Sequence, residues 1–339
     1  MFAFLQENLI PEIPLDSGTD AFVDYVQDIK VIDDFFDLVK DGIGAFVGAL
    51  EVALTAPPEL LMVAILAAIA FFVSGWRVAL FSVLGFLLII SIGLWEATML
   101  SLALVLAATV ISLLIGVPIG VLAAKSRILE AGARPTLDIM QTMPAFVYLV
   151  PMVVFLGLGG APGLVATVIF AAPPAVRLTM LGIQQVPQNT VEAAHAFGAT
   201  PWQTLRKVEL PQALPTIMAG VNQVIMLALS MVVIAALVGA EGLGQAVVRG
   251  LSQLDVGRAF VGGVGIVVIA IYLDRVTRPL GSLIQRKPGA KKAKGALSKV
   301  LPGRKKEADV DPDTAGTTGS GAEDTAKVGA KAGTGSGST

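Results

Sequence analysis

Long apolar runs fill most of the chain between residues 57 and 275. A helix needs roughly 20 consecutive apolar residues to cross the hydrocarbon core of a bilayer. We therefore predict an all-α integral membrane protein. A count of six or eight spans is also possible, because the run containing Pro144 and Pro151 is predicted to be kinked or broken. The best count is seven spans, at 59–74, 78–95, 97–124, 144–160, 162–182, 214–240 and 259–274.

The composition supports this interpretation and narrows the function. Charged residues make up 15% of the chain and apolar residues 55%, whereas soluble domains are typically about 25% charged. The chain has no Cys and one His, which excludes disulfides and thiolate sites and leaves little scope for His-based metal or catalytic centres. We predict no metal site and no catalytic residue, and a transport or scaffold protein rather than an enzyme.

The first 57 residues carry an excess of acid. Eleven Asp and Glu stand against Lys30 and Lys40. Apolar residues at three- and four-residue spacings from Phe22 to Val39 indicate an amphipathic helix. We predict an acidic extracytoplasmic segment over 1–57, which either lies on a surface of the membrane or of a partner, or forms a solvated arm.

Positive charge near the ends of the spans predicts their orientation. Short cytoplasmic loops carry an excess of Lys and Arg, and Lys125, Arg127, Arg206 and Lys207 fall on one side if the N-terminus is outside. Residues 275–306 hold eleven Lys and Arg and no acid. The chain is therefore predicted to lie in the plasma (inner) membrane, with a permease domain over 58–275. Residues 276–339 are predicted as a cytoplasmic tail, first basic and then low-complexity and disordered.

The loop over 183–213 has strong helix start and stop signals. Asn189 is predicted to cap a first helix with Glu192 at its third position, and Gly198 to end it. Thr200 followed by Pro201 predicts a second helix start, and we expect Pro211 to break that second helix. A compact helix–turn–helix on one side of a membrane bundle suits docking into a groove of a soluble partner.

This loop resembles a known signature. The pattern Glu192-Ala193-Ala194-x3-Gly198-x9-Val208-x-Leu210-Pro211 is similar to the EAA motif of binding-protein-dependent ABC importer permeases. The departure is Val208, where Ile is commoner. Residues 138–151, 218–223 and 226–233 resemble the glycine betaine/proline betaine (quaternary amine) subfamily. The likeness covers about residues 55–275.

The resemblance implies a type I ABC importer permease fold. It also implies a permease homodimer, a cytoplasmic ABC ATPase seated on the loop, and an extracytoplasmic substrate-binding protein. The chain contains no GxxxxGK[ST] motif, so we expect it to bind no cofactor and the partner ATPase to use ATP and Mg²⁺. We expect no nucleic-acid partner. The residues that the resemblance assigns to ATPase coupling are Glu192, Ala193, Ala194, Gly198, Val208, Leu210 and Pro211.

Polar side chains within the predicted spans are candidates for the substrate pathway. These are Tyr148, Asn222, Gln223 and Ser230. For each of them an interhelical hydrogen bond is the competing and favoured interpretation. Arg177 is expected to snorkel toward the cytoplasm or to pair with a loop acid. Gly116-x3-Gly120 fits close helix packing.

The predicted function is ATP-driven import of glycine betaine, proline betaine or a related quaternary-amine osmolyte. The alternatives are a permease for another small solute (choline, carnitine or an amino acid), or an ion-coupled secondary transporter or channel. Coupled carriers usually place ionisable groups at bilayer depth, whereas Glu96 and Asp274 lie at the ends of predicted spans.

Overall fold

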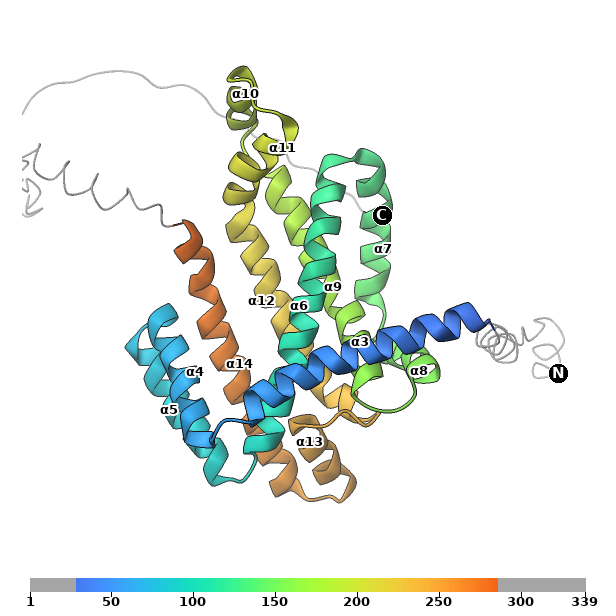
Figure 1. Ribbon diagram of the computed structural model, residues 1–339, viewed down its shortest axis with the longest axis vertical. Helices are drawn as coiled ribbons and strands as arrows, with labels where there is room; N and C mark the ends of the chain where they lie inside the picture. The colour runs from blue at the N-terminus through green and yellow to red at the C-terminus, as the bar shows by residue number, and fades with distance from the viewer. Residues whose placement is uncertain (1–28, 286–339) are drawn as a thin grey trace, which may run out of the picture. The chain divides into compact units, whose positions relative to one another are not determined.

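The computed structural model describes residues 29–285, apart from the side chains of residues 33 and 280–285, and over this range it contains helices and no strand. This confirms the all-α fold class. In chain order the helices are α3 (Lys30–Thr55), α4 (Glu59–Ser74), α5 (Trp76–Ser91), α6 (Trp95–Lys125), α7 (Arg127–Thr142), α8 (Ala145–Leu156), α9 (Gly160–Gln184), α10 (Gln188–Ala196), α11 (Pro201–Thr204), the π-helical turn η1 (Leu205–Glu209), α12 (Leu210–Ala236), α13 (Leu243–Ser252) and α14 (Val256–Gln285) (Figure 1).

Helices α6, α9 and α12 form the centre of the bundle, because glycines let their backbones approach closely. A Cβ built at Gly120 of α6 would lie 2.6 Å from the Val176 carbonyl oxygen of α9. A Cβ at Gly116 would lie 2.6 Å from the Cβ of Ala175. Small residues at helix interfaces are typical of membrane bundles, where dispersion contacts hold helices together. The predicted packing role of Gly116 and Gly120 is confirmed.

Four helical stretches are long and apolar enough to cross a membrane. They are α6, α9, Pro201–Ala236 and the part of α14 from Val256 to Pro279. Two bent pairs, α3 with α4 and α7 with α8, raise the count to six if each pair is one span, and α5 is shorter. The preferred count of seven therefore exceeds what the described helices support by length and composition.

The predicted span 144–160 is counted only together with α7. Helix α8 has 12 residues, or about 18 Å, and it meets α7 at an angle of 93°. The break falls at Met143 and Pro144, because proline disfavours helical backbone in the residue before it. The expected break is therefore real, and it leaves α8 too short to cross the bilayer alone.

The first described helix, α3, packs across the bundle against α6, α8 and α9 (Figure 1). Its Phe36 stacks on Phe155 of α8 with ring centroids 4.6 Å apart, and Ile43 and Val47 pack against the main core. The rest of the predicted acidic segment, residues 1–28, lies outside the described residues, as does the predicted tail from residue 286. Helix α14 continues to Gln285, ten residues beyond the predicted end of the permease domain.

We predict that Gly120→Ala lowers the unfolding temperature of the purified protein, because the new methyl group would overlap the backbone of α9. The expected loss is about 1–3 kcal/mol, as for other overpacked sites. The control is Gly132→Ala in α7, where an added Cβ meets nothing within 4 Å and better helix propensity should be neutral or slightly stabilising. A thermal melt in detergent distinguishes the two; equal melting temperatures would contradict close packing at Gly120.

Candidate functional site

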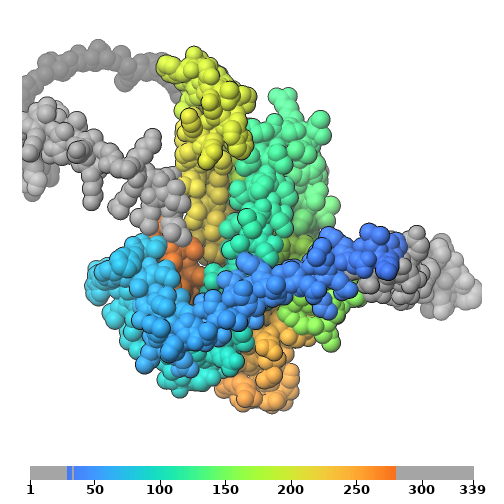
Figure 2. All heavy atoms as spheres, viewed as in Figure 1, coloured from blue at the N-terminus to red at the C-terminus, as the bar shows by residue number. Residues whose placement is uncertain are grey.

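A projecting element, which we call the connector (residues 185–211), joins α9 to α12. Its first helix, α10, contains no buried residue. In Figure 2 the yellow-green atoms at the tip of this region project beyond the ends of the neighbouring α6 and α7. A short structured element that buries none of its own side chains is available to a partner.

The turn after α10 is a Schellman motif. The Gly198 N–H donates to the His195 carbonyl at 2.9 Å, and the Ala199 N–H donates to the Ala194 carbonyl at 3.0 Å. Gly198 has φ +77°, a left-handed conformation in which a side chain is strained. The prediction that Gly198 ends this helix is confirmed.

Of the two predicted helix starts, the one at Thr200 is confirmed. Thr200 caps α11 with a complete capping box, in which its hydroxyl accepts from the Gln203 N–H and the Gln203 side chain accepts from the Thr200 N–H. The prediction for Asn189 is wrong. Helix α10 begins at Gln188, two residues earlier than an Asn189 cap requires, and has no side-chain cap, because Pro187 with its fixed φ already takes the cap position.

The predicted break at Pro211 is also wrong. The chain passes from α11 through η1 into α12, and the Leu210 N–H donates to the Leu205 carbonyl, five residues back. This π-helical register precedes Pro211, which then occupies the first turn of α12. A proline has no N–H to donate to the preceding turn, and the π-helical register just before Pro211 accommodates it without a break in the helix. The connector is thus continuous with a membrane-spanning helix.

An ion pair with a buried carboxylate ties this continuous segment to the bundle. Glu209, at the end of η1, is 4% exposed, and its carboxylate pairs with the Lys125 ammonium at the last residue of α6. Removing one partner of such a pair would be destabilising, because it leaves a buried carboxylate without its counter-charge. Movement of the connector is therefore linked mechanically to α6. Sequence reasoning missed this pair, although Glu209 lies inside the signature.

The predicted coupling residues fall into two groups. Glu192, Ala193, Gly198 and Pro211 are exposed, whereas Ala194, Val208 and Leu210 are half-buried. Two large exposed side chains beside them were not predicted as site residues, namely Phe197 at 92% exposure and Trp202 at 66%. Exposed aromatic residues flanked by small residues are typical anchors of a docking surface.

The four candidate pathway residues do not meet in one cavity. Asn222 faces α14, where its amide oxygen accepts a hydrogen bond from the Thr277 hydroxyl at 2.9 Å. Tyr148 donates to the Met140 carbonyl at 2.7 Å. Ser230 donates to the Met226 carbonyl of its own helix at 3.0 Å, and Gln223 is exposed. Asn222 thus makes the interhelical hydrogen bond that was the favoured alternative, and Tyr148 links α8 to the end of α7.

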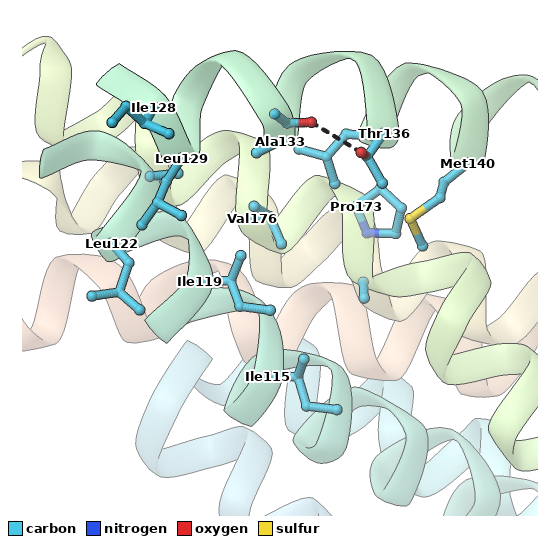
Figure 3. A pocket seen from close by; sticks show the side chains of 14 residues that line it. Ile115, Ile119, Leu122, Ile128, Leu129, Ala133, Thr136, Met140, Pro173 and Val176 are labelled. Atoms are coloured by element: carbon cyan, nitrogen blue, oxygen red, sulfur yellow. Dashed lines mark hydrogen bonds between the residues drawn. The ribbon is translucent and has the colours of Figure 1, made fainter. Parts of the chain in front are cut away.

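The cavities differ sharply in chemistry. One of about 480 Å³ between α6, α7 and α9 has a single polar side chain, Thr136, whose hydroxyl is bonded to the Gly132 carbonyl at 2.9 Å (Figure 3). A second cavity, of about 300 Å³ between α7 and α9, contains the ion pair between Arg177 and Asp138. The predicted pairing of Arg177 with an acid is therefore confirmed, and the acid belongs to α7.

Comparison with known proteins identifies a family and several relatives. Residues 116–285, which contain the whole connector, match the family described as binding-protein-dependent transport system inner membrane component. The glycine betaine transport system permease protein OpuAB of Bacillus subtilis (strain 168) is 48% identical over 269 residues, covering 79% of this chain and 95% of that protein.

Two further relatives show similar identity. The glycine betaine/carnitine transport permease protein GbuB of Listeria monocytogenes serotype 1/2a (strain 10403S) is 48% identical over 79% of this chain and 96% of its own length. The glycine betaine/proline betaine transport system permease protein ProW of Escherichia coli (strain K12) is 47% identical over 79% of this chain and 75% of its own length.

We predict that Lys125→Met destabilises the protein more than the double substitution Lys125→Met/Glu209→Leu. The single change leaves the Glu209 carboxylate buried without a partner, at an expected cost of about 1–3 kcal/mol, whereas the double change removes both charges. Thermal melts of the purified variants provide the measurement. Arg278→Met is the control, because Arg278 is exposed and pairs with Asp274 within a single helix, so its melting temperature should stay near that of wild type. A double variant no more stable than Lys125→Met would refute the role of the pair.

Proposed function

Because the chain belongs to the family of binding-protein-dependent transport system inner membrane components, we propose that this permease subunit imports glycine betaine or a closely related quaternary-amine osmolyte. The family is the membrane component of ABC importers, and its members are transport permeases rather than catalysts. The observation that supports this substrate is the term glycine betaine, which the names of the three relatives share. Each relative is 47–48% identical over 79% of this chain.

The surface of the connector supports a docked ATPase as the source of energy. Phe197 and Trp202 offer apolar contact area, and the exposed Ala193 lets a partner approach the backbone of α10. Because η1 and α12 are continuous and Lys125 pairs with Glu209, a force on the connector reaches α12 and α6 together. ATP binding and hydrolysis on the partner would in this way rearrange the centre of the bundle and expose the pathway to alternate sides.

The same assembly includes a second permease copy and a binding protein. Gln223, Met226 and Ser230 recur at helical spacing on an exposed face of α12, and a polar membrane face of this kind suits the axis between two copies. The connector and Lys125 lie on the cytoplasmic side in this proposal, with the N-terminus outside, as the distribution of Lys and Arg favours. The binding protein then delivers the solute at the opposite end of α6.

We predict that complexes of this permease with its ATPase and binding protein, reconstituted in liposomes, take up labelled glycine betaine only when ATP is supplied to the ATPase side. Unlabelled proline betaine or carnitine should compete, because each carries a quaternary ammonium and a carboxylate. Competition by histidine or methionine but not by the betaines would refute the substrate. Uptake driven by an ion gradient without the ATPase would refute the energy source.

We predict that Phe197→Ala weakens binding of the ATPase by roughly 10-fold or more, the loss expected for a central aromatic anchor. Affinity of the purified ATPase for the permease in nanodiscs measures the effect. The matched control is Phe72→Ala on α4, a phenylalanine of similar exposure (82%) that lies outside the connector. Equal affinities for the two variants would place the docking surface elsewhere.

A further inference from the structure

The cavity between α7 and α9 has charged and apolar side chains in one lining. It measures about 300 Å³, and its polar lining consists of Arg134, Asp138, Arg177 and Gln184. Arg134 pairs with Glu130 on its own helix, so the charges available to a solute are Arg177 and Asp138. Its apolar lining comes from Leu137, Met180 and Leu181. The volume is at the lower end of the range for small-molecule sites, which is about 300–1,000 Å³.

We propose that this cavity is a binding site for the zwitterionic solute on its way to the cytoplasm, with Arg177 holding the carboxylate and Asp138 facing the quaternary ammonium. This inference rests on the proposed function, since it takes its ligand from there. The pairing follows from the chemistry: a guanidinium can bind a carboxylate through two parallel hydrogen bonds, and a methylated ammonium, which has no N–H to donate, requires a nearby negative charge together with apolar contact.

The ion pair itself explains how an empty site remains stable. Arg177 on α9 and Asp138 on α7 neutralise each other across the cavity, with side chains 40% and 64% exposed. A solute with one positive and one negative group replaces each partner by an equivalent charge, so neither residue is left unpaired. A singly charged solute would displace one partner and leave that partner's charge unpaired, and a neutral solute would gain no charge interaction with the pair, so both are disfavoured.

The level of the cavity along the bundle fits a late step of transport. Val176, next to Arg177, meets Gly120 of α6, five residues or about 7 Å before Lys125 and the attached connector. The site is thus close to the predicted cytoplasmic end of the bundle. Its lining comes from α7 and α9.

The chemistry also predicts weak binding, as transport requires. The lining contains no aromatic side chain, so the cation–π contacts that would hold a quaternary ammonium tightly are missing there. A transport site must release its solute as readily as it accepts it. Partial exposure of both charged groups weakens their attraction further.

The test labels an introduced cysteine, because the chain contains no cysteine of its own. Leu181→Cys places a single thiol in the lining of the cavity, and Gln253→Cys, exposed at the turn between α13 and α14, is the control. Each variant, assembled with its ATPase in nanodiscs without nucleotide or binding protein, is labelled with a water-soluble maleimide. Glycine betaine should slow labelling at position 181 and leave position 253 unchanged, and choline or acetate at the same concentration should protect much less.

Substitution of the two charged residues gives the second arm. In the Leu181→Cys background, Arg177→Gln and Asp138→Asn should each raise the concentration of glycine betaine for half-protection at least about tenfold, as expected on losing a charge-assisted contact. Arg177→Lys keeps the charge but not the two parallel hydrogen bonds, so its half-protection should lie between those of wild type and Arg177→Gln, an order that a general loss of folding would not produce. Unchanged labelling with glycine betaine, protection as strong with choline or acetate, or unchanged half-protection in the variants would each overturn the site.

Uptake by the unmodified complex separates the two proposals. If the complex imports glycine betaine while Leu181→Cys shows no protection, the cavity is wrong and the proposed function stands. If the complex imports no glycine betaine and competitor assays identify a solute of different charge, the proposed substrate is wrong and the site falls with it.

Discussion

The close contact of three helix backbones is the constraint on which the rest of the structure depends. Gly116 and Gly120 place α6 against α9, and Gly220 places α12 against α9. A Cβ built at Gly220 would lie 3.2 Å from the Cβ of Leu178 on α9. In a bilayer, burial of apolar surface contributes little to helix association, so close packing must hold the helices. Every functional feature described above is attached to one of these three helices.

The connector illustrates how that rigid centre can respond to a partner. A loop joined to the bundle only by flexible backbone could be displaced without consequence. Here η1 continues into α12, and Glu209 is fixed to Lys125 at the end of α6. The π-helical turn lets Pro211 enter α12 without breaking it, so the same local irregularity that accommodates the proline also keeps the connection stiff.

The sequence predicted those features that depend on local chemistry and missed those that depend on distant partners. Hydropathy located 97–124, 162–182 and 214–240 within a few residues of α6, α9 and α12, because span length follows from bilayer thickness. The capping box at Thr200 was predictable because its donors and acceptors lie within four residues. The register shift at η1 was not, since proline in isolation predicts a break. No periodicity indicates that Glu209 meets Lys125, 84 positions earlier, or that Arg177 meets Asp138 rather than another acid.

The polar residues of the bundle also show why type and depth alone identify a pathway poorly. Asn222 and Tyr148 are polar and lie within predicted spans, yet hydrogen bonds to Thr277 and to the Met140 carbonyl already occupy them. Arg177 is likewise occupied, but by a carboxylate whose replacement by the carboxylate of a solute changes no charge. A partner that can be exchanged for an equivalent group on the solute distinguishes a binding residue from a structural one. By this criterion the Arg177–Asp138 pair is a stronger candidate for contact with a zwitterion than Asn222 and Tyr148, which were chosen for their polarity and their place in predicted spans.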